Sequence, residues 1–285
     1  MLKGLYTAYT AMVNEQHRMD VMTNNLANAT TNGYKKEGST SQAFDNVLAY
    51  KIKDLSEPGN LPRLISTPKS VDEYELNNEA NPDYLKNRVT RVGMNLGVKI
   101  GENYVDFSEG PLKETGNTFD LALTGRGFFA IEYTNKAGVT SVKYTRDGNF
   151  AMDRDGYLRT QDGDYVLDDT GRQIRMNTAL PVSIDRSGNI IQDGNTVATI
   201  GITDFEDYDY LEHFGENFFE PIEGATIIES DSEIYSGYLE MANMSVVTEM
   251  VNMIAIQRHY DSNQKVITTF DETLDIAVNQ LGKIR

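Results

Sequence analysis

The stretch NNLANATTNGYKK, Asn24 to Lys36, decides how the N-terminal part of the chain folds. It follows a run with the spacing of an amphipathic helix and is rich in Asn, Thr and Gly, which are poor helix formers that cap helices and turn chains. We therefore predict that the helix ends at Asn28 to Gly33 and that Tyr34 restarts an ordered segment in a new direction. Gly33 is expected to have a positive φ, at which Ala is milder than Val.

The segments at both ends have apolar residues at alternating spacings of three and four, which is typical of one side of a helix. The N-terminal seam has Gln16 and Thr23 at two positions and is otherwise formed by Leu2, Leu5, Tyr9, Met12, Met19 and Leu26. The C-terminal seam has a heptad-like repeat, interrupted by polar residues, through Val246, Met250, Met253, Gln257, Tyr260, Gln264, Ile267, Asp271, Leu274 and Val278. Spacing alone allows each helix to pack on its own domain or to join a coiled coil between molecules.

The middle of the chain has the pattern of short antiparallel strands. Asp-Gly and Ser-Gly turn dipeptides recur between runs of Val, Ile, Tyr, Phe and Leu, at 147–148, 155–156, 162–163, 187–188 and 193–194. All seven prolines lie between Pro58 and Pro221. We predict an α+β protein with four parts: a helix and corner at 1–36, an extended excursion at 37–95, a β-rich domain of antiparallel hairpins at 96–239, and a C-terminal helix at 240–285.

The net charge of -17 is concentrated in the middle. Residues 1–36 have four basic and two acidic side chains, a net +2, and residues 240–285 have four basic and six acidic ones, a net -2, so the middle carries -17. Nucleic-acid binding usually needs a basic stripe. The pattern argues against such binding and indicates that the ends meet a partner while the middle faces water.

The residues offer little for catalysis or for a cofactor. The chain has no cysteine and three histidines far apart in sequence, so a zinc or imidazole site is not expected. The Asp-rich run at 152–171 lacks the oxygen-ligand pattern of an EF-hand, and TGRGFF contains a lone G-x-G without the rest of a dinucleotide loop. We expect no enzyme activity, cofactor or metal, and neither a membrane span nor a cleaved signal.

Three separated blocks resemble the bacterial flagellar basal-body rod and hook proteins. The first is the corner, where the family's N-N-L-A-N and T-x-G-F/Y-K/R stretches match Asn24, Asn25, Leu26, Ala27, Asn28, Thr31, Gly33, Tyr34, Lys35 and Lys36. The second is TGNTFDLALTGRGFFAIE with YTRDGNFAMDRDGYLRT, and the third is the tail from GYLEMAN onward. Residues 46–94 and 195–235 fall outside these blocks.

The resemblance implies a structural subunit whose terminal helices pair as a coiled coil and pack into a tube around an export channel. It adds Ile254 and Arg258 to the expected assembly interface, and it marks Asn24, Asn25, Asn28, Thr31, Gly33 and Tyr34 as the helix-end corner. The implied partners are copies of the same chain in a helical homopolymer, other flagellar rod and hook proteins, and envelope ring proteins. The implied location is the basal body, reached through the flagellar export apparatus.

Distal rod is the first expectation, because the tail stays rod-like through ETLDIAVNQLGKI and the chain is short for a hook protein. A proximal rod or hook-type axial protein is the alternative within the family. An alternative of another class is a secreted β-rich module that binds carbohydrate or calcium, with the terminal helices clasping it.

Overall fold

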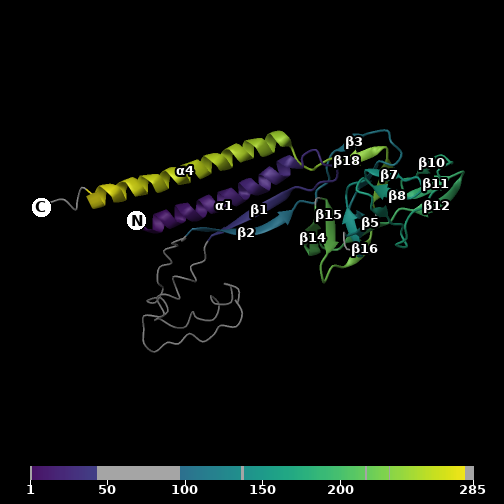
Figure 1. The fold of residues 1–285 in the computed structure, drawn as a ribbon, viewed down its shortest axis with the longest axis horizontal. Coiled ribbons are helices and arrows are strands. Elements are labelled where there is room, and N and C mark those ends of the chain that lie inside the picture. The colour runs from purple at the N-terminus through teal and green to yellow at the C-terminus, as the bar shows by residue number, and fades with distance from the viewer. Residues whose placement is uncertain (1, 44–96, 136–137, 216, 231, 280–285) are drawn as a thin grey trace, which may run out of the picture. The chain divides into compact units, whose positions relative to one another are not determined.

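The computed structural model describes residues 2–43, 97–135, 138–215, 217–230 and 232–279, with side chains from Gly4 onward (Figure 1). Most of the excursion predicted at 37–95 lies outside the described residues. The chain divides into two compact units, one formed by residues 1–17, 40–102 and 256–285 and the other by residues 18–39 and 103–255. Each unit is described by itself.

Two long helices lie near the ends of the chain, as the apolar spacing predicts (Figure 1). They are α1 (Leu2–Ala27) and α4 (Val246–Asn279). Helix α1 ends just before Asn28, the residue at which the Asn/Thr/Gly run predicted its end. None of the described helices combines the length and the apolar character needed to cross a membrane. With the antiparallel strands between the helices, the α+β class is confirmed.

The first unit contains polar contacts between α1 and a two-stranded ribbon. The ribbon consists of β1 (Glu37–Ala43) and β2 (Val98–Val105). The Thr10 hydroxyl accepts a hydrogen bond from the Val98 N–H at 3.3 Å, and Asn14 Nδ2 donates to Ser41 Oγ at 2.9 Å. Isolated two-stranded ribbons are marginal in water, so these contacts with α1 support the ribbon.

The second unit contains the strand-rich region, in which all pairs are antiparallel. Its largest sheet has the order β14-β15-β6-β5-β9-β8-β7, with β13 joining β5 to β16. The strands of this sheet are β5 (Phe128–Thr134), β6 (Thr140–Thr145), β7 (Phe150–Met152), β8 (Leu158–Thr160), β9 (Tyr165–Val166), β13 (Ile202–Phe205), β14 (Leu211–Phe214), β15 (Phe218–Pro221) and β16 (Ile227–Glu229). A 3-10 helix, η1 (Tyr208–Tyr210), precedes β14.

Three smaller sheets complete this unit. One has the order β10-β11-β12, with β10 (Val182–Ile184), β11 (Asn189–Gln192) and β12 (Asn195–Thr199). The other two pair β4 (Leu121–Thr124) with β17 (Glu233–Ser236), and β3 (Leu112–Glu114) with β18 (Tyr238–Glu240). The predicted hairpin at Asp193-Gly194 is present, because both residues have positive φ and join β11 to β12 at the Gln192–Asn195 pair.

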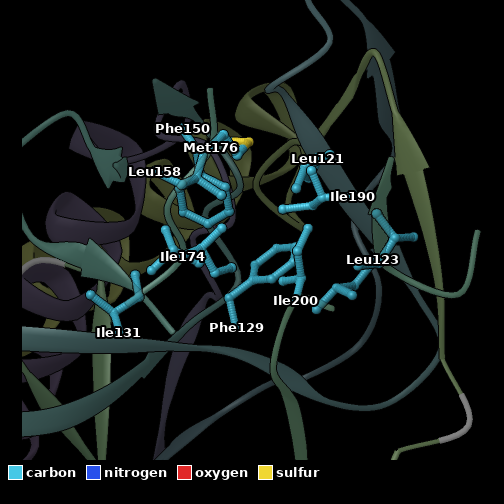
Figure 2. Packing of buried hydrophobic residues seen from close by; sticks show 12 residues of the cluster. Leu121, Leu123, Phe129, Ile131, Phe150, Leu158, Ile174, Met176, Ile190 and Ile200 are labelled. Atoms are coloured by element: carbon cyan, nitrogen blue, oxygen red, sulfur yellow. The ribbon is translucent and has the colours of Figure 1, made fainter. Parts of the chain in front are cut away.

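Strand β5 separates two hydrophobic clusters. Phe129 and Ile131 point into one cluster, where Figure 2 shows them among side chains that include Ile174 and Ile200. Phe128 and Ala130, on the alternate positions, belong to the other cluster. The period of two along a strand sends successive side chains to opposite faces. Burial on both faces explains why β5 has the continuous apolar run FFAI rather than an alternating one.

Candidate assembly site

The corner after α1 is built on a buried asparagine. Asn25 is 2% exposed, and its Oδ1 accepts hydrogen bonds from the Tyr34 hydroxyl at 3.0 Å and from the Glu37 N–H at 2.9 Å. Its Nδ2 donates to the Glu37 carbonyl at 2.8 Å. Burial, with the nearby Glu37 charge, raises the pKa of Tyr34 to about 12, so the hydroxyl remains a donor. Asn25 therefore fixes the direction of the chain where β1 begins.

The other Asn and Thr residues of the corner close the end of the helix. Asn28 Nδ2 donates to Asn24 Oδ1 at 2.8 Å, and the Asn28 N–H reaches the Asn25 carbonyl at 3.0 Å. The Thr31 N–H donates to the Asn28 carbonyl at 3.1 Å. The two backbone bonds satisfy carbonyl groups that a helix end leaves without partners. Of the six residues predicted for the corner, Asn24 and Asn25 lie in the last turn of α1, Asn28, Thr31 and Gly33 lie in the turn that follows, and Tyr34 comes directly after that turn.

Gly33 holds the tightest position of the corner. Its φ is +67°, as predicted, and its N–H donates to the Glu240 carbonyl at 2.7 Å. A Cβ atom at Gly33 would lie 2.4 Å from the Asp147 backbone nitrogen and 2.5 Å from the Arg146 carbonyl carbon. The clash arises at the Cβ that Ala and Val share, so Ala is expected to be only slightly milder than Val.

A buried charged cluster lies beside Gly33. It consists of Lys35, Arg146 and Glu240, each at most 2% exposed. Lys35 Nζ donates to Glu240 Oε1 at 2.6 Å and to the Ser108 carbonyl at 2.7 Å. Glu240 Oε1 also accepts from the Gly110 N–H at 2.9 Å. Burial lowers the pKa of Lys35, and the Glu240 carboxylate opposes that shift.

Arg146 is the second cation of this cluster. Its Nη1 lies 3.4 Å from Glu240 Oε2, and its Nη2 donates to the Gly125 carbonyl at 2.7 Å. Its Nε is buried without a hydrogen-bond partner among the described residues. Two buried cations thus contact the same carboxylate, so Glu240 offsets part of the cost of burying both charges.

The seam predicted on α1 is only partly covered. Leu5, Met12, Met19 and Leu26 are half-buried, whereas Tyr9 is exposed; the Leu2 side chain lies outside the described residues. Phe270 of α4 packs on Gly4, where a Cβ would lie 3.0 Å from Phe270 Cζ. The fully buried side chains of α1 are Ala8, Asn14, Val21 and Asn25, none of which was in the predicted seam.

On α4, half of the predicted heptad is displaced by one residue. The less exposed positions alternate in steps of four and three: Glu249, Met253, Ile256, Tyr260, Asn263, Ile267 and Phe270. Three predicted residues share this face: Met253, Tyr260 and Ile267. The other predicted residues are exposed: Val246, Met250, Ile254, Gln257, Arg258, Leu274 and Val278. The chain itself covers one face of α4 and leaves apolar side chains on another.

Family comparisons match three segments of the chain. Residues 5–35 match the model described as "Flagella basal body rod protein", residues 122–192 match "Flagellar hook protein FlgE/F/G D1 domain", and residues 235–281 match "Flagellar basal body rod FlgEFG protein C-terminal". The flagellar basal-body rod protein FlgG of Bacillus subtilis is 31% identical over 98% of this chain and 99% of its own length. The chain belongs to the flagellar basal-body rod family.

Other members of the rod family match over similar lengths. FlgG of Agrobacterium fabrum is 30% identical over 98% of this chain and all of its own length. FlgF of Caulobacter vibrioides is 29% identical over the full length of both chains. Membership of this family makes the chain a structural protein of the flagellar basal body rather than an enzyme. We therefore prefer the rod family to the alternative of a secreted β-rich module that binds carbohydrate or calcium.

The buried cluster joins the three segments that match the rod family models. Lys35, Arg146 and Glu240 each come from a different segment. Asn243 adds a further link, because its Oδ1 accepts from the Lys36 N–H at 2.8 Å and its Nδ2 donates to the Asp106 carbonyl at 2.6 Å. Sequence reasoning included Lys35 in the corner motif but did not single out Arg146 or Glu240. Arg146 and Glu240 stand within the central block and the tail that resemble the family, yet no spacing rule pairs residues this far apart in sequence.

Asp147, which adjoins Gly33 in this rod protein, provides a prediction about pH. Burial raises its pKa to about 6, assisted by Asp162 and Asp120 and opposed by the hydrogen bond from the Asn149 N–H. The folded state therefore binds this proton more tightly than the unfolded chain. Its contribution to stability is fully present below about pH 4 and is lost as the pH rises through about 6.

Asp147→Asn should match the wild type below about pH 4 and exceed its free energy of unfolding by on the order of 2 to 3 kcal/mol above pH 7. Urea unfolding of the full chain between pH 4 and 8 measures the difference. The exposed Asp155→Asn provides the control, with a smaller difference from wild type expected above pH 7. A pH-independent difference for Asp147→Asn would contradict the assignment.

Proposed function

We propose that the chain is a subunit of the distal rod that polymerises through its terminal helices into a tubular axial shaft. The shaft transmits torque and encloses the export channel. The observation that carries this proposal is the set of exposed apolar side chains along α4, from Val246 to Val278. A long helix with so much uncovered apolar surface is poorly stabilised in water, and assembly would cover that surface.

Within one subunit, we propose that α1 and α4 pair as a coiled coil. The alternating steps of four and three between Glu249 and Phe270 follow a heptad repeat. The packing of Phe270 on Gly4 supports this pairing at one position, where the absence of a side chain lets the ring approach α1 closely. The apolar groove of about 340 Å³ beside Phe270 and Val266 leaves room for a further side chain.

The proposed distal position in the rod rests on the length over which relatives match this chain and on the names of those relatives. Proteins named FlgG match this chain over nearly their whole length, and the tail keeps its heptad pattern through Val278. The match to FlgF makes another rod position the second candidate, and a hook-type protein the third.

We propose that the partners are further copies of this chain, other rod and hook proteins, and envelope ring proteins. The part of the chain at 37–95 would provide contacts specific to this subunit. The acidic middle fits an outer surface that faces water. The flagellar export apparatus would carry the chain across the inner membrane.

A test of the proposed function is Met253→Asp, which places a carboxylate on the covered face of α4. Burying an unpaired charge costs several kcal/mol, so rods should fail to form while near-ultraviolet circular dichroism still reports a folded β-rich region. The measurement is a swimming assay together with fractionation of basal bodies. The neighbouring Asn252→Asp, an exposed position with the same charge change, should assemble. Motile cells with Met253→Asp would contradict the role of this face.

A further inference from the structure

The sequence contains a single Asn-Gly dipeptide, Asn32-Gly33, which lies in the turn after α1. Asparagine followed by glycine is prone to deamidation, because glycine has no side chain to hinder the approach of its own nitrogen. In this reaction the Gly33 nitrogen gives up its proton to the solvent and attacks Asn32 Cγ, and ammonia leaves. Water then opens the resulting succinimide ring, and residue 32 becomes aspartate or isoaspartate.

The peptide group between Asn32 and Gly33 is held on both sides. Its carbonyl, that of Asn32, accepts a hydrogen bond from Asn217 Nδ2 at 2.7 Å. Its N–H, that of Gly33, donates to the Glu240 carbonyl at 2.7 Å. Two segments far away in the sequence thus satisfy both polar atoms of this one peptide group. The nitrogen that would attack Asn32 is therefore engaged as a hydrogen-bond donor.

Packing around Gly33 restricts this peptide group further. Gly33 is buried, and the backbone of Arg146 and Asp147 lies so close that a Cβ would be 2.4 to 2.7 Å from three of its atoms. Formation of the ring needs the peptide group to rotate until its nitrogen reaches Asn32 Cγ. That rotation would break both hydrogen bonds and press Gly33 against this backbone. The reaction therefore requires the corner to open.

We propose that Asn32 is a deamidation site that is accessible in the unfolded chain and protected by the folded corner. This inference concerns a single chain and does not rest on the proposed function. A reaction that needs opening proceeds in proportion to the population of the open form. Because distant segments hold the corner closed, we expect at least hundredfold protection. Each tenfold corresponds to about 1.4 kcal/mol, so the corner would open with a free energy of at least about 2.8 kcal/mol.

The products of the reaction do not fit the corner as Asn32 does. In isoaspartate the main chain runs through the Cβ of residue 32, which lengthens the backbone just before Gly33. The lengthened backbone cannot keep both hydrogen bonds of the peptide group while Gly33 stays against Arg146 and Asp147. Aspartate keeps the backbone and adds a negative charge at a half-buried position. A chain that forms isoaspartate before it folds therefore loses the contacts that direct it into β1.

Peptide mapping by mass spectrometry tests the proposal on the full chain. The wild-type chain is kept at mildly alkaline pH in native buffer and in concentrated guanidinium chloride, and conversion is followed in the tryptic peptide 19–35, whose fragments also report Asn28. In denaturant, Asn32 should convert at least tenfold faster than Asn28. In native buffer, Asn32 should convert at least a hundredfold more slowly than in denaturant. Equal rates in either comparison would overturn the proposal.

Asn217→Ala tests whether the bond to the Asn32 carbonyl contributes to the protection. The change removes the Nδ2 donor and keeps the Asn217 backbone, whose carbonyl accepts from the Thr145 hydroxyl at 2.8 Å. In native buffer, where a melting curve shows the chain to be folded, Asn32 should convert at least threefold faster than in wild type. The exposed Asn195→Ala is the control and should stay within the wild-type rate. Equal rates for both variants would overturn the assignment of protection to this peptide group.

Refolding after ageing tests the effect of the products. Wild-type and Asn32→Gln chains are aged in denaturant and diluted into native buffer; glutamine cyclises far more slowly, because its ring is larger. We expect at least fivefold less isoaspartate at residue 32 in the refolded wild-type fraction than in the aggregated fraction. Asn32→Gln should refold with the same yield before and after ageing. Equal isoaspartate in the two wild-type fractions would show that the corner accommodates the product.

Discussion

Gly33→Val is expected to abolish assembly and to destabilise the folded chain by roughly 3 to 5 kcal/mol. Two costs add up. A β-branched residue at φ +67° is strained, and its Cβ would meet backbone atoms of Arg146 and Asp147 at 2.4 to 2.7 Å. Backbone atoms cannot move away as the end of a flexible side chain can, so residue 33 itself would have to shift. That shift would break the hydrogen bond from the residue 33 N–H to the Glu240 carbonyl.

Urea unfolding of the purified chain and fractionation of basal bodies measure the two effects of Gly33→Val. Gly33→Ala should be nearly as severe, because it shares the Cβ. Ala29→Ser, at a position that the corner motif leaves free, should be tolerated. Wild-type stability of Gly33→Val would mean that the corner can relax and that the run from Asn28 to Gly33 is an ordinary loop.

Glu240→Ala is expected to cost about 3 to 5 kcal/mol, because it leaves Lys35 and Arg146 buried without the carboxylate that both contact. It also removes the acceptor of the Gly110 N–H. The loss should appear as a lower urea midpoint for the full chain. It should also remove the chain from basal bodies, since the cluster ties the N-terminal corner to the segment that leads into α4.

Glu233→Ala is the matched control for this change. Glu233 belongs to β17, is largely exposed, and lies 4.0 Å from Arg186, so its loss should cost less than about 1 kcal/mol. Equal urea midpoints for the two variants would show that the buried cluster contributes no more than a surface ion pair.

Local chemistry explains what the sequence predicts correctly. The end of α1 follows from Asn, Thr and Gly, whose effects act over a few residues, and the turn at Asp193-Gly194 follows from its dipeptide. The positive φ of Gly33 is also local. The severity expected of Ala at Gly33 does not follow from local sequence, because the clash is with Asp147, more than a hundred residues away in sequence.

Long-range packing explains what the sequence does not show. Hydrophobic spacing favours Met250 for the covered face of α4, yet the chain buries Glu249 and exposes Met250. On α1, spacing favours Tyr9, whereas the polar Asn14 is turned inward by its bond to Ser41. Apolar periodicity identifies a helix, but it does not show which face of the helix packs on the rest of the same chain and which remains exposed.

Electron cryomicroscopy of basal bodies isolated from the source bacterium tests the central claim most directly. We expect repeated copies of this chain in the rod, with α1 and α4 forming the wall of the tube. A rod that lacks the chain, or a rod in which the terminal helices of the chain make no contact with neighbouring copies, would contradict the account.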